Sequence, residues 1–427
     1  MYTQSLIILL LVFVNATLTL AATNSNKPVD FNVVTDCENI TPDGTTDITQ
    51  AFQTCINDKL SNGVGGKIFL PSGTYLFSGT INFSTIGSGS QPLEFIGQGR
   101  TTKFLWSSDD DLFVFGGNNG EVTHSTFSKF LIQATGKNKN TNATALHFIN
   151  GCTQSIFTDI MVESDDGNNI YPMNVLDLGP LSDTVSIIRP LFQNVIGTGV
   201  KIGRGSQVRL AGGRIFGRAV VNGDWIQGSI GVHCKGNNGG VHVDSTDLIG
   251  LQIGFLLDQS NGQGSNREIF ISQGTIDSNY RGLAVHDNSY IDISGVWTAS
   301  SGDANIYVAS EASPLISLNG GTIFNAGAIP TSSKTLANDG IAWHGTGSFV
   351  ISGVTLRNNK GKSLHIMNKN MKNFAVSGCQ FYGNGMNLDI VGDNYTIVGN
   401  LFQHNLNGNT NNIGDHSHAI IANNLGL

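Results

Sequence analysis

Four side chains in the middle of the sequence could together act on a sugar chain: Asp247, Asp277, Arg214 and Trp297. Hydrolysis of a glycosidic bond needs one carboxylic acid to protonate the leaving oxygen and a second carboxylate to activate water or attack the sugar. Asp247 and Asp277 are candidates for this pair, because the repeat described below places their α-carbons roughly 8 Å apart on neighbouring strands. Trp297 would offer a flat apolar surface to a pyranose ring.

Cleavage by elimination is an alternative chemistry for the same region. It needs a base beside the C5 proton of a uronate and a cation that neutralises the carboxylate, and Arg214 or Arg281 could be that cation. A simpler interpretation is that Arg214 and Asp247 only pair with each other on a sheet surface, which contributes about 0.2–1 kcal/mol. His344 and His365 are expected on adjacent repeats, but two histidines without a third ligand do not make a metal site. We therefore predict no metal site. We also predict no cofactor.

The spacing of these residues follows from a repeat in the C-terminal half of the chain. Each repeat contains an alternating strand, a glycine, a second alternating strand and then Asn, Ser or Gly. The glycines, separated by 25, 33, 25 and 21 residues, are Gly295, Gly320, Gly353, Gly378 and Gly399. Extending the register toward the N-terminus gives further anchor positions at Gln273, Ser245, Gly212, Arg189, Asp159 and Lys129. Intervals of roughly 20–35 residues with short strands are typical of a solenoid.

The side chains that follow each anchor provide a check on this register. If the strand after the anchor alternates, the third residue beyond it faces the core, and the second and fourth face solvent. The third-position residues are Ile132, Val162, Phe192, Ile215, Leu248, Ile276, Thr298, Ile323, Leu356, Phe381 and Phe402. All except Thr298 are large and apolar, which supports the register. Asp247, Asp277, Arg214 and Trp297 are then outward residues on adjacent coils.

One segment has helical rather than alternating spacing. Its apolar residues are Ile48, Ala51, Phe52, Cys55, Ile56 and Leu60, and Asp47 or Thr46 would be its N-cap. We predict a helix over residues 47–58 that covers the N-terminal end of the solenoid, because an uncovered coil would leave strand edges unpaired. The predicted fold class is all-β, a right-handed parallel β-helix with a short N-terminal capping α-helix. A β-sandwich is the alternative, but it fits the irregular intervals less well.

The N-terminus and four sequons indicate a secreted, extracellular protein. Residues 1–21 are predicted to be a signal peptide, because a short apolar run precedes Thr19-Leu20-Ala21. Residues 22–100 are expected to form the cap helix and first coils, continuous in one domain with the β-helix coils of residues 101–427. Glycosylation sequons begin at Asn39, Asn82, Asn142 and Asn394.

Composition limits the partners and the role of the cysteines. A net charge of −8 without a basic run argues against nucleic acid. No stretch after residue 21 approaches the roughly 20 apolar residues that span a bilayer, so we predict no membrane insertion. Cys37 and Cys55 could form a disulfide, whereas Cys152, Cys234 and Cys379 are expected to be small buried hydrophobes.

The N-terminal stretch resembles the opening of proteins of the pectate-lyase superfamily. The residues that carry the resemblance are Asp43-Gly44, Asp47, Gly65-Gly66-Lys67-Ile68-Phe69-Leu70-Pro71 and Gly73-Thr74-Tyr75. Pectin hydrolases, lyases and phage tailspikes share this opening. The chain lacks the Asn-Thr-Asp, Gly-His-Gly and Arg-Ile-Lys motifs of polygalacturonases, although Asp165-Asp166 is similar to their paired aspartates. The resemblance implies a protein that acts on a polysaccharide as a hydrolase or lyase; a non-catalytic carbohydrate-binding or structural β-helix is the alternative.

Overall fold

The structure is a computed structural model that describes residues 29–60, 65–83, 92–117, 120–135, 142–164, 173–218, 220–221, 224–225, 227–259, 264–329, 337–371, 373–407, 410–411 and 418–427. The predicted signal peptide and Asp165-Asp166 lie outside these residues.

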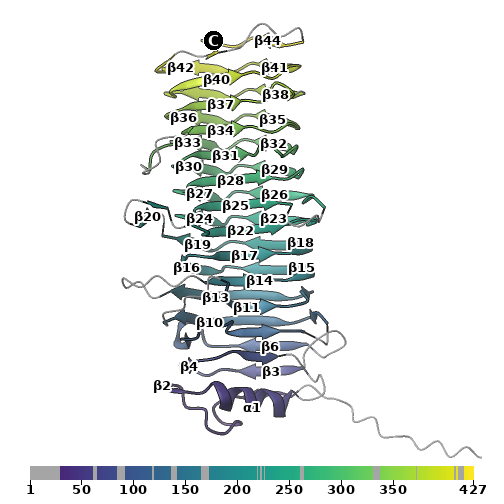
Figure 1. Cartoon of the computed structure of the whole chain (residues 1–427), viewed down its shortest axis with the longest axis vertical. Helices are drawn as coiled ribbons and strands as arrows, with labels where there is room; N and C mark the ends of the chain where they lie inside the picture. Colours follow the sequence, from purple (N-terminus) through teal and green to yellow (C-terminus); the bar gives the residue numbers. More distant parts are fainter. Residues whose placement is uncertain are drawn as a thin grey trace, which may run out of the picture.

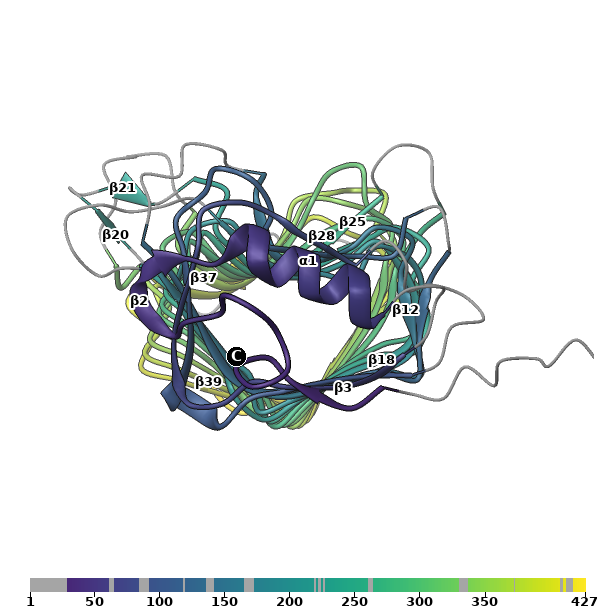
Figure 2. The same cartoon turned by 90° about the horizontal axis from the view of Figure 1, so that it is seen from below.

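The chain winds into a stack of coils along one axis, as Figure 1 shows. Strands of successive coils pair in parallel and form a 29-stranded and a 13-stranded sheet, and the described residues also contain one short antiparallel hairpin of β20 (Val220–Val221) and β21 (Asp224–Trp225). Seen along the axis, the sheets enclose a core on three sides (Figure 2). This arrangement confirms the predicted right-handed parallel β-helix.

Three faces are defined by their strands. The larger sheet bends into face I and face II, and β10 (Thr126–Ala134) and β13 (Ile156–Ser164) continue from one to the other. The other strands of face I are β1 (Phe31–Asn32), β3 (Gly66–Phe69), β6 (Leu93–Ile96), β9 (Val122–Thr123), β12 (Cys152–Thr153), β15 (Pro180–Ile188), β18 (Arg204–Ala211), β23 (Val241–Asp244), β26 (Ile269–Ser272), β29 (Tyr290–Ser294), β32 (Leu315–Asn319), β35 (Ser348–Ser352), β38 (Phe374–Ser377), β41 (Tyr395–Val398) and β44 (Ile420–Ala422). The other strands of face II are β2 (Asp43–Asp47), β4 (Gly73–Phe77), β7 (Thr102–Trp106), β16 (Leu191–Val195), β19 (Arg214–Gly217), β24 (Asp247–Ile249), β27 (Thr275–Asp277), β30 (Trp297–Ala299), β33 (Thr322–Phe324), β36 (Thr355–Arg357), β39 (Gln380–Tyr382) and β42 (Leu401–Gln403).

The 13-stranded sheet is face III. Its strands are β5 (Ile81–Phe83), β8 (Phe113–Phe115), β11 (Thr144–Phe148), β14 (Asn174–Asp177), β17 (Thr198–Ile202), β22 (Ile230–Lys235), β25 (Ile253–Asp258), β28 (Arg281–His286), β31 (Ala304–Val308), β34 (Asp339–Trp343), β37 (Lys362–Ile366), β40 (Met386–Ile390) and β43 (Thr410–Asn411).

The corner between face I and face II explains the repeated glycine. Every anchor position found in the sequence has a positive φ, from 48° at Ser245 to 68° at Gly399. Glycine adopts this left-handed conformation without the steric cost that a side chain adds. The non-glycine anchors, such as Lys129 and Asp159, adopt it as well. The interval between anchors in the sequence is therefore the interval between successive turns from face I to face II.

The predicted core column is confirmed. Ile215, Leu248, Ile276, Thr298 and Ile323 pair one after another across adjacent strands, and every member of the eleven-residue column is buried. The column continues through Leu356 to Phe381 and Phe402. Because side chains alternate along a strand, the residues on either side of this column point outward.

The predicted capping helix is confirmed as α1 (Thr49–Lys59), with Phe52 and Ile56 buried. Figure 2 shows it lying across the N-terminal end of the coils. The predicted N-cap was wrong: the cap residue is Ile48, and Asp47 instead accepts a hydrogen bond from the amide of Thr49 at 3.0 Å.

The cysteines divide as the sequence suggested. Cys37 and Cys55 form a disulfide with α-carbons 5.6 Å apart, which ties α1 to the segment before it. Cys152, Cys234 and Cys379 are free and buried. Within the described residues, no helix has the length and apolar character that would carry it across a membrane.

Candidate functional site

The residues predicted to form a sugar-binding patch lie together on face II. Arg214, Asp247, Thr275 and Trp297 pair in register across the adjacent strands β19, β24, β27 and β30, and Asp277 lies two residues beyond Thr275. The four side chains therefore lie on adjacent strands of one face, as the sequence predicted. The roles of these side chains remain a proposal.

Arg214 and Asp247 are bound to each other. Arg214 Nε lies 2.9 Å from Asp247 Oδ2, with the side chains 59% and 24% exposed. This contact matches the simpler interpretation of the sequence, in which Arg214 and Asp247 only pair with each other on the sheet surface. Asp277 accepts a hydrogen bond from the Ser278 hydroxyl at 3.0 Å.

Arg281 does not join this patch. It begins β28 on face III, where its Nε donates to Asp303 Oδ2 at 2.8 Å and its guanidinium lies 3.4 Å from the centre of the Tyr307 ring. The sequence offered Arg281 as an alternative to Arg214 for the cation that neutralises a uronate, and the structure separates the two, because the turn after β27 carries the chain from face II to face III.

A different set of ionisable side chains projects from face III. His147, Asp177, Lys201 and His233 pair in register on the four consecutive strands β11, β14, β17 and β22. The residues beside His147, Leu146 and Phe148, are buried in the core, so the ring itself points outward. Coils are about 4.8 Å apart, and this column therefore presents an imidazole, a carboxylate and an ammonium group at successive steps of that length.

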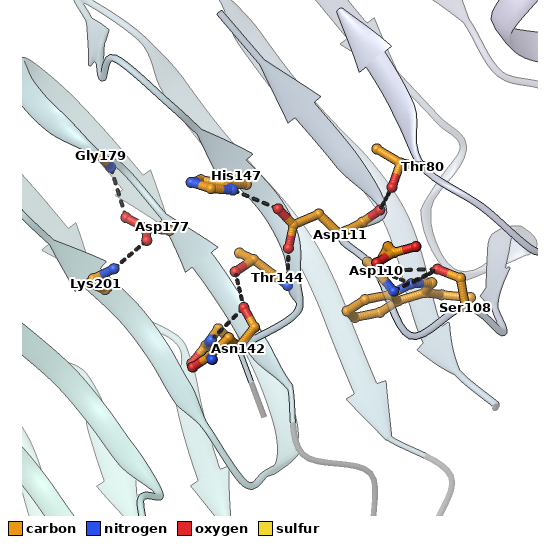
Figure 3. Close-up of polar contacts among 12 residues, drawn as sticks. Thr80, Ser108, Asp110, Asp111, Asn142, Thr144, His147, Asp177, Gly179 and Lys201 are labelled. Carbon is orange, nitrogen blue, oxygen red and sulfur yellow. Dashed lines mark hydrogen bonds and ion pairs between the residues drawn. The ribbon is translucent and has the colours of Figure 1, made fainter. Parts of the chain in front are cut away.

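His147 is held by a fixed carboxylate, as Figure 3 shows. Its Nδ1 lies 2.6 Å from Asp111 Oδ2, while Asp111 Oδ1 accepts the Thr144 amide at 2.7 Å. The hydrogen bond with Asp111 raises the pKa of His147, against the opposing effect of burial. The side chain of His147 is 32% exposed, and its Nε2 has no hydrogen-bond partner in the part of the chain that the structure describes. The imidazole is thus oriented, with one nitrogen open for proton transfer.

The next two steps of the column form an ion pair. Lys201 Nζ lies 2.6 Å from Asp177 Oδ2, and Asp177 Oδ1 accepts the Gly179 amide at 2.9 Å (Figure 3). The Asp177 side chain is 10% exposed and the Lys201 side chain 34%. The carboxylate is thus mostly covered, and the ammonium group is the more accessible member of the pair.

A second polar network on face III lies toward the C-terminus, on β34, β37 and β40. His365 Nδ1 lies 2.7 Å from Asp339 Oδ2, and its Nε2 lies 2.9 Å from Lys362 Nζ. Lys362 also binds Asp389 Oδ2 at 2.7 Å. Both nitrogens of His365 are engaged and its side chain is only 16% exposed, so this network lacks the open nitrogen of His147. The described residues contain no group of three or more His, Cys, Asp or Glu side chains arranged to hold a metal ion.

Analysis of the sequence missed His147 and its neighbours. Asp111 is 36 residues away, so no local motif joins the two. A signal was present, however: His147, Asp177 and Lys201 are each a single ionisable residue between two apolar residues, and this triplet recurs once per coil. A search for repeated outward charges on every strand, rather than only after the anchor, would have found the column.

Comparison with known proteins supports the fold. Residues 31–212, which include Asp111, His147, Asp177 and Lys201, match the family model "Rhamnogalacturonase A/epimerase, pectate lyase-like". The curated proteins contain no match to the chain. Two similar solved structures show the shared architecture. The mannuronan C-5 epimerase AlgE4 A-module of Azotobacter vinelandii is 13% identical with a TM-score of 0.59, over 92% of this chain and 100% of that one. The DFA-IIIase of Arthrobacter chlorophenolicus A6 without its lid, in complex with GF2, is 12% identical with a TM-score of 0.51, over 93% and 99%. The protein is therefore a right-handed parallel β-helix protein that is pectate-lyase-like over residues 31–212.

Proposed function

We propose that this protein is a secreted enzyme that binds an extracellular polysaccharide and breaks its glycosidic bonds at face III. The observation that carries the proposal is the Asp111–His147 pair, which leaves Nε2 of an oriented imidazole exposed beside the Asp177–Lys201 ion pair. The pectate-lyase-like match over the same residues and the likeness to a mannuronan epimerase favour a saccharide as the substrate.

Elimination at a uronate is the reaction that this arrangement supports best. Nε2 of neutral His147 would remove the C5 proton, the C4–oxygen bond would break, and a double bond would form between C4 and C5. The leaving oxygen would take a proton from water, and protonated His147 would return the C5 proton to the solvent, so atoms and charges balance without a further reactant. Lys201, roughly 9.6 Å from His147 between α-carbons, could bind the uronate carboxylate through a second N–H of its ammonium group while it stays paired with Asp177, because sugar rings extend across more than one coil.

Hydrolysis at face II is the second candidate. Asp247 and Asp277 lie on consecutive coils, and Trp297 is one coil farther along. In this proposal the two aspartates are the acid and the base, and Arg214 and Trp297 bind the sugar. The bond between Arg214 and Asp247 weakens this candidate, since Arg214 occupies the carboxylate that the reaction would need to be free.

A non-catalytic saccharide-binding role has support from face I. A cavity of about 360 Å³ lies there, and its lining includes the exposed residues Tyr290, Leu315 and Val350. Such a surface could hold a sugar chain by apolar contact, although Glu268 and Asp292 also line the cavity. The protein would then bind a polysaccharide and leave it intact.

The test is a screen of the purified protein against a panel of neutral and uronate-containing polysaccharides. New reducing ends together with ultraviolet absorbance of unsaturated uronates would support elimination at face III. Reducing ends without that absorbance would support hydrolysis, and binding without either would support the non-catalytic role. The four sequon residues Asn39, Asn82, Asn142 and Asn394 are exposed, and mass measurement of the secreted protein would test their proposed glycosylation.

A further inference from the structure

Arg357 occupies an unusual position on the outer surface of face II. It ends β36 and pairs in register with Phe324 on β33 and Tyr382 on β39. Its guanidinium lies 4.7 Å from the centre of the Phe324 ring and 5.8 Å from that of Trp297. The rings therefore hold the cation in place through cation–π contacts.

Arg357 has no acidic partner among the described residues, in contrast to four of the other arginines. Arg189, Arg209, Arg214 and Arg281 each bind an aspartate at 3.0 Å or less, whereas Arg357 forms no ion pair with any described residue. Its Nε is buried and finds no hydrogen-bond partner among those residues. Because Nε is closed to solvent, an anionic ligand would have to bind the terminal nitrogens of the guanidinium, and it would stabilise a cation that has no acidic partner among the described residues.

The space beside Arg357 suits a small acidic ligand. A cavity of about 220 Å³ is lined by Thr355, Arg357, Gln380, Phe381, Tyr382, Leu401 and Gln403. None of these residues is acidic, so the lining does not repel an anion. Tyr382 is 46% exposed and offers a flat ring, and the two glutamine side chains can donate hydrogen bonds. The cavity is smaller than the roughly 300–1,000 Å³ of sites for drug-sized ligands, which fits one sugar ring.

We propose that Arg357, with Gln380, Tyr382 and Gln403, binds the carboxylate of a uronate residue in the polysaccharide. The guanidinium would bind the two carboxylate oxygens, and the Tyr382 ring would contact the apolar side of the pyranose. The inference rests on the proposed function only in taking a saccharide as the ligand. It adds a binding site on face II that is separate from His147 on face III.

The test is calorimetric titration of the full chain with trimers of galacturonate, mannuronate and glucuronate, and with the same trimers after their carboxyl groups are reduced to alcohols. The His147→Gln variant is used as the background, so that cleavage does not consume the ligand. At least one acidic trimer should bind, and its reduced form should bind at least tenfold more weakly. Arg357→Gln should weaken binding of the acidic trimer at least tenfold, and Arg357→Lys should do so to a smaller extent, because lysine keeps the charge and loses the planar fork.

Arg189→Gln is the matched control. It removes one positive charge from an exposed arginine that already has an aspartate partner, so affinity should not change. Melting temperatures of all variants should be measured, and a folded Arg357→Lys protein keeps the test valid if Arg357→Gln does not fold. Equal binding of acidic and reduced trimers, or equal affinities in the Arg357 and Arg189 variants, would overturn the site even if the wild type cleaves the polysaccharide. Arg357-dependent binding without cleavage by the wild type would keep the site and reject the proposed enzyme.

Discussion

Face II and face III both carry charged side chains paired across adjacent coils, but the pairs differ in what they leave available. On face II, Asp247 is bound to a permanently charged arginine, and the result is a neutral surface pair. On face III, Asp111 is bound to a histidine, which gains orientation and a raised pKa while Nε2 stays open. The two faces therefore differ in the partner of the carboxylate: Arg214 on face II, and on face III His147, whose second ring nitrogen has no partner among the described residues.

The largest expected effect comes from His147→Gln. Loss of a positioned acid or base lowers rates by about 10²–10⁴-fold, and this variant should lose that much activity on the substrate found in the screen. Its melting temperature should stay close to that of the wild type, since the side chain lies outside the core. His286→Gln is the control, because His286 is a similarly exposed histidine bound to Glu311 on the same face. Normal cleavage by His147→Gln would remove face III from the mechanism.

Leu356→Ala should have the next largest effect, on stability. Leu356 is fully buried in the column that supports both faces, and truncation of such residues costs about 2–5 kcal/mol. The free energy of unfolding, measured with a chemical denaturant, should fall by that amount, whereas the activity per folded molecule should not change. A cost well below this range would show that the column contributes less to the fold than its burial indicates.

The pH dependence of activity tests whether His147 is the base. His147 acts as a base only when neutral, so activity should rise with pH through a midpoint above the ordinary histidine value of about 6.5. Asp111→Asn removes the main cause of the raised pKa and should move the midpoint toward acid. The pair's contribution to stability has the opposite dependence: it is complete below the ordinary pKa and is lost as the pH rises through the raised pKa. A midpoint unchanged in Asp111→Asn would separate His147 from the observed titration.

Much of this architecture could be predicted from the sequence because it depends on local patterns. The glycines at Gly295 and Gly353 revealed the corner, and alternation then placed Leu248 and Leu356 in the core. The candidate site on face III could not be predicted in the same way. Loops of variable length separate the strands of that face from the corner, so the anchor register does not extend to Asp111 or His147.

On face II, the sequence predicted the positions of the residues but not the contacts of their side chains. Alternation correctly placed Arg214 and Asp247 on neighbouring coils, but it gave no information about the direction in which their side chains turn. The structure shows that they turn toward each other. Arg357 was missed altogether, because its distinguishing features are its contacts with the rings of Phe324 and Trp297 and its buried Nε, which only three-dimensional contacts can show.

The smallest expected effect is that of Asp247→Asn, and it tests face II directly. An exposed pair such as Arg214–Asp247 contributes about 0–1 kcal/mol, so the variant should lose at most a few degrees in melting temperature. Its activity should follow the amount of folded protein, because the elimination that we propose at face III does not use this carboxylate. Asp277→Asn should behave alike, since among the described residues this carboxylate accepts one hydrogen bond, from its neighbour Ser278. A loss of nearly all activity in both variants, with unchanged melting temperatures and with His147→Gln fully active, would instead identify Asp247 and Asp277 as the acid and base of a hydrolase. Face II would then be the catalytic face, and the pair between Asp247 and Arg214 would exist only in the protein without its substrate.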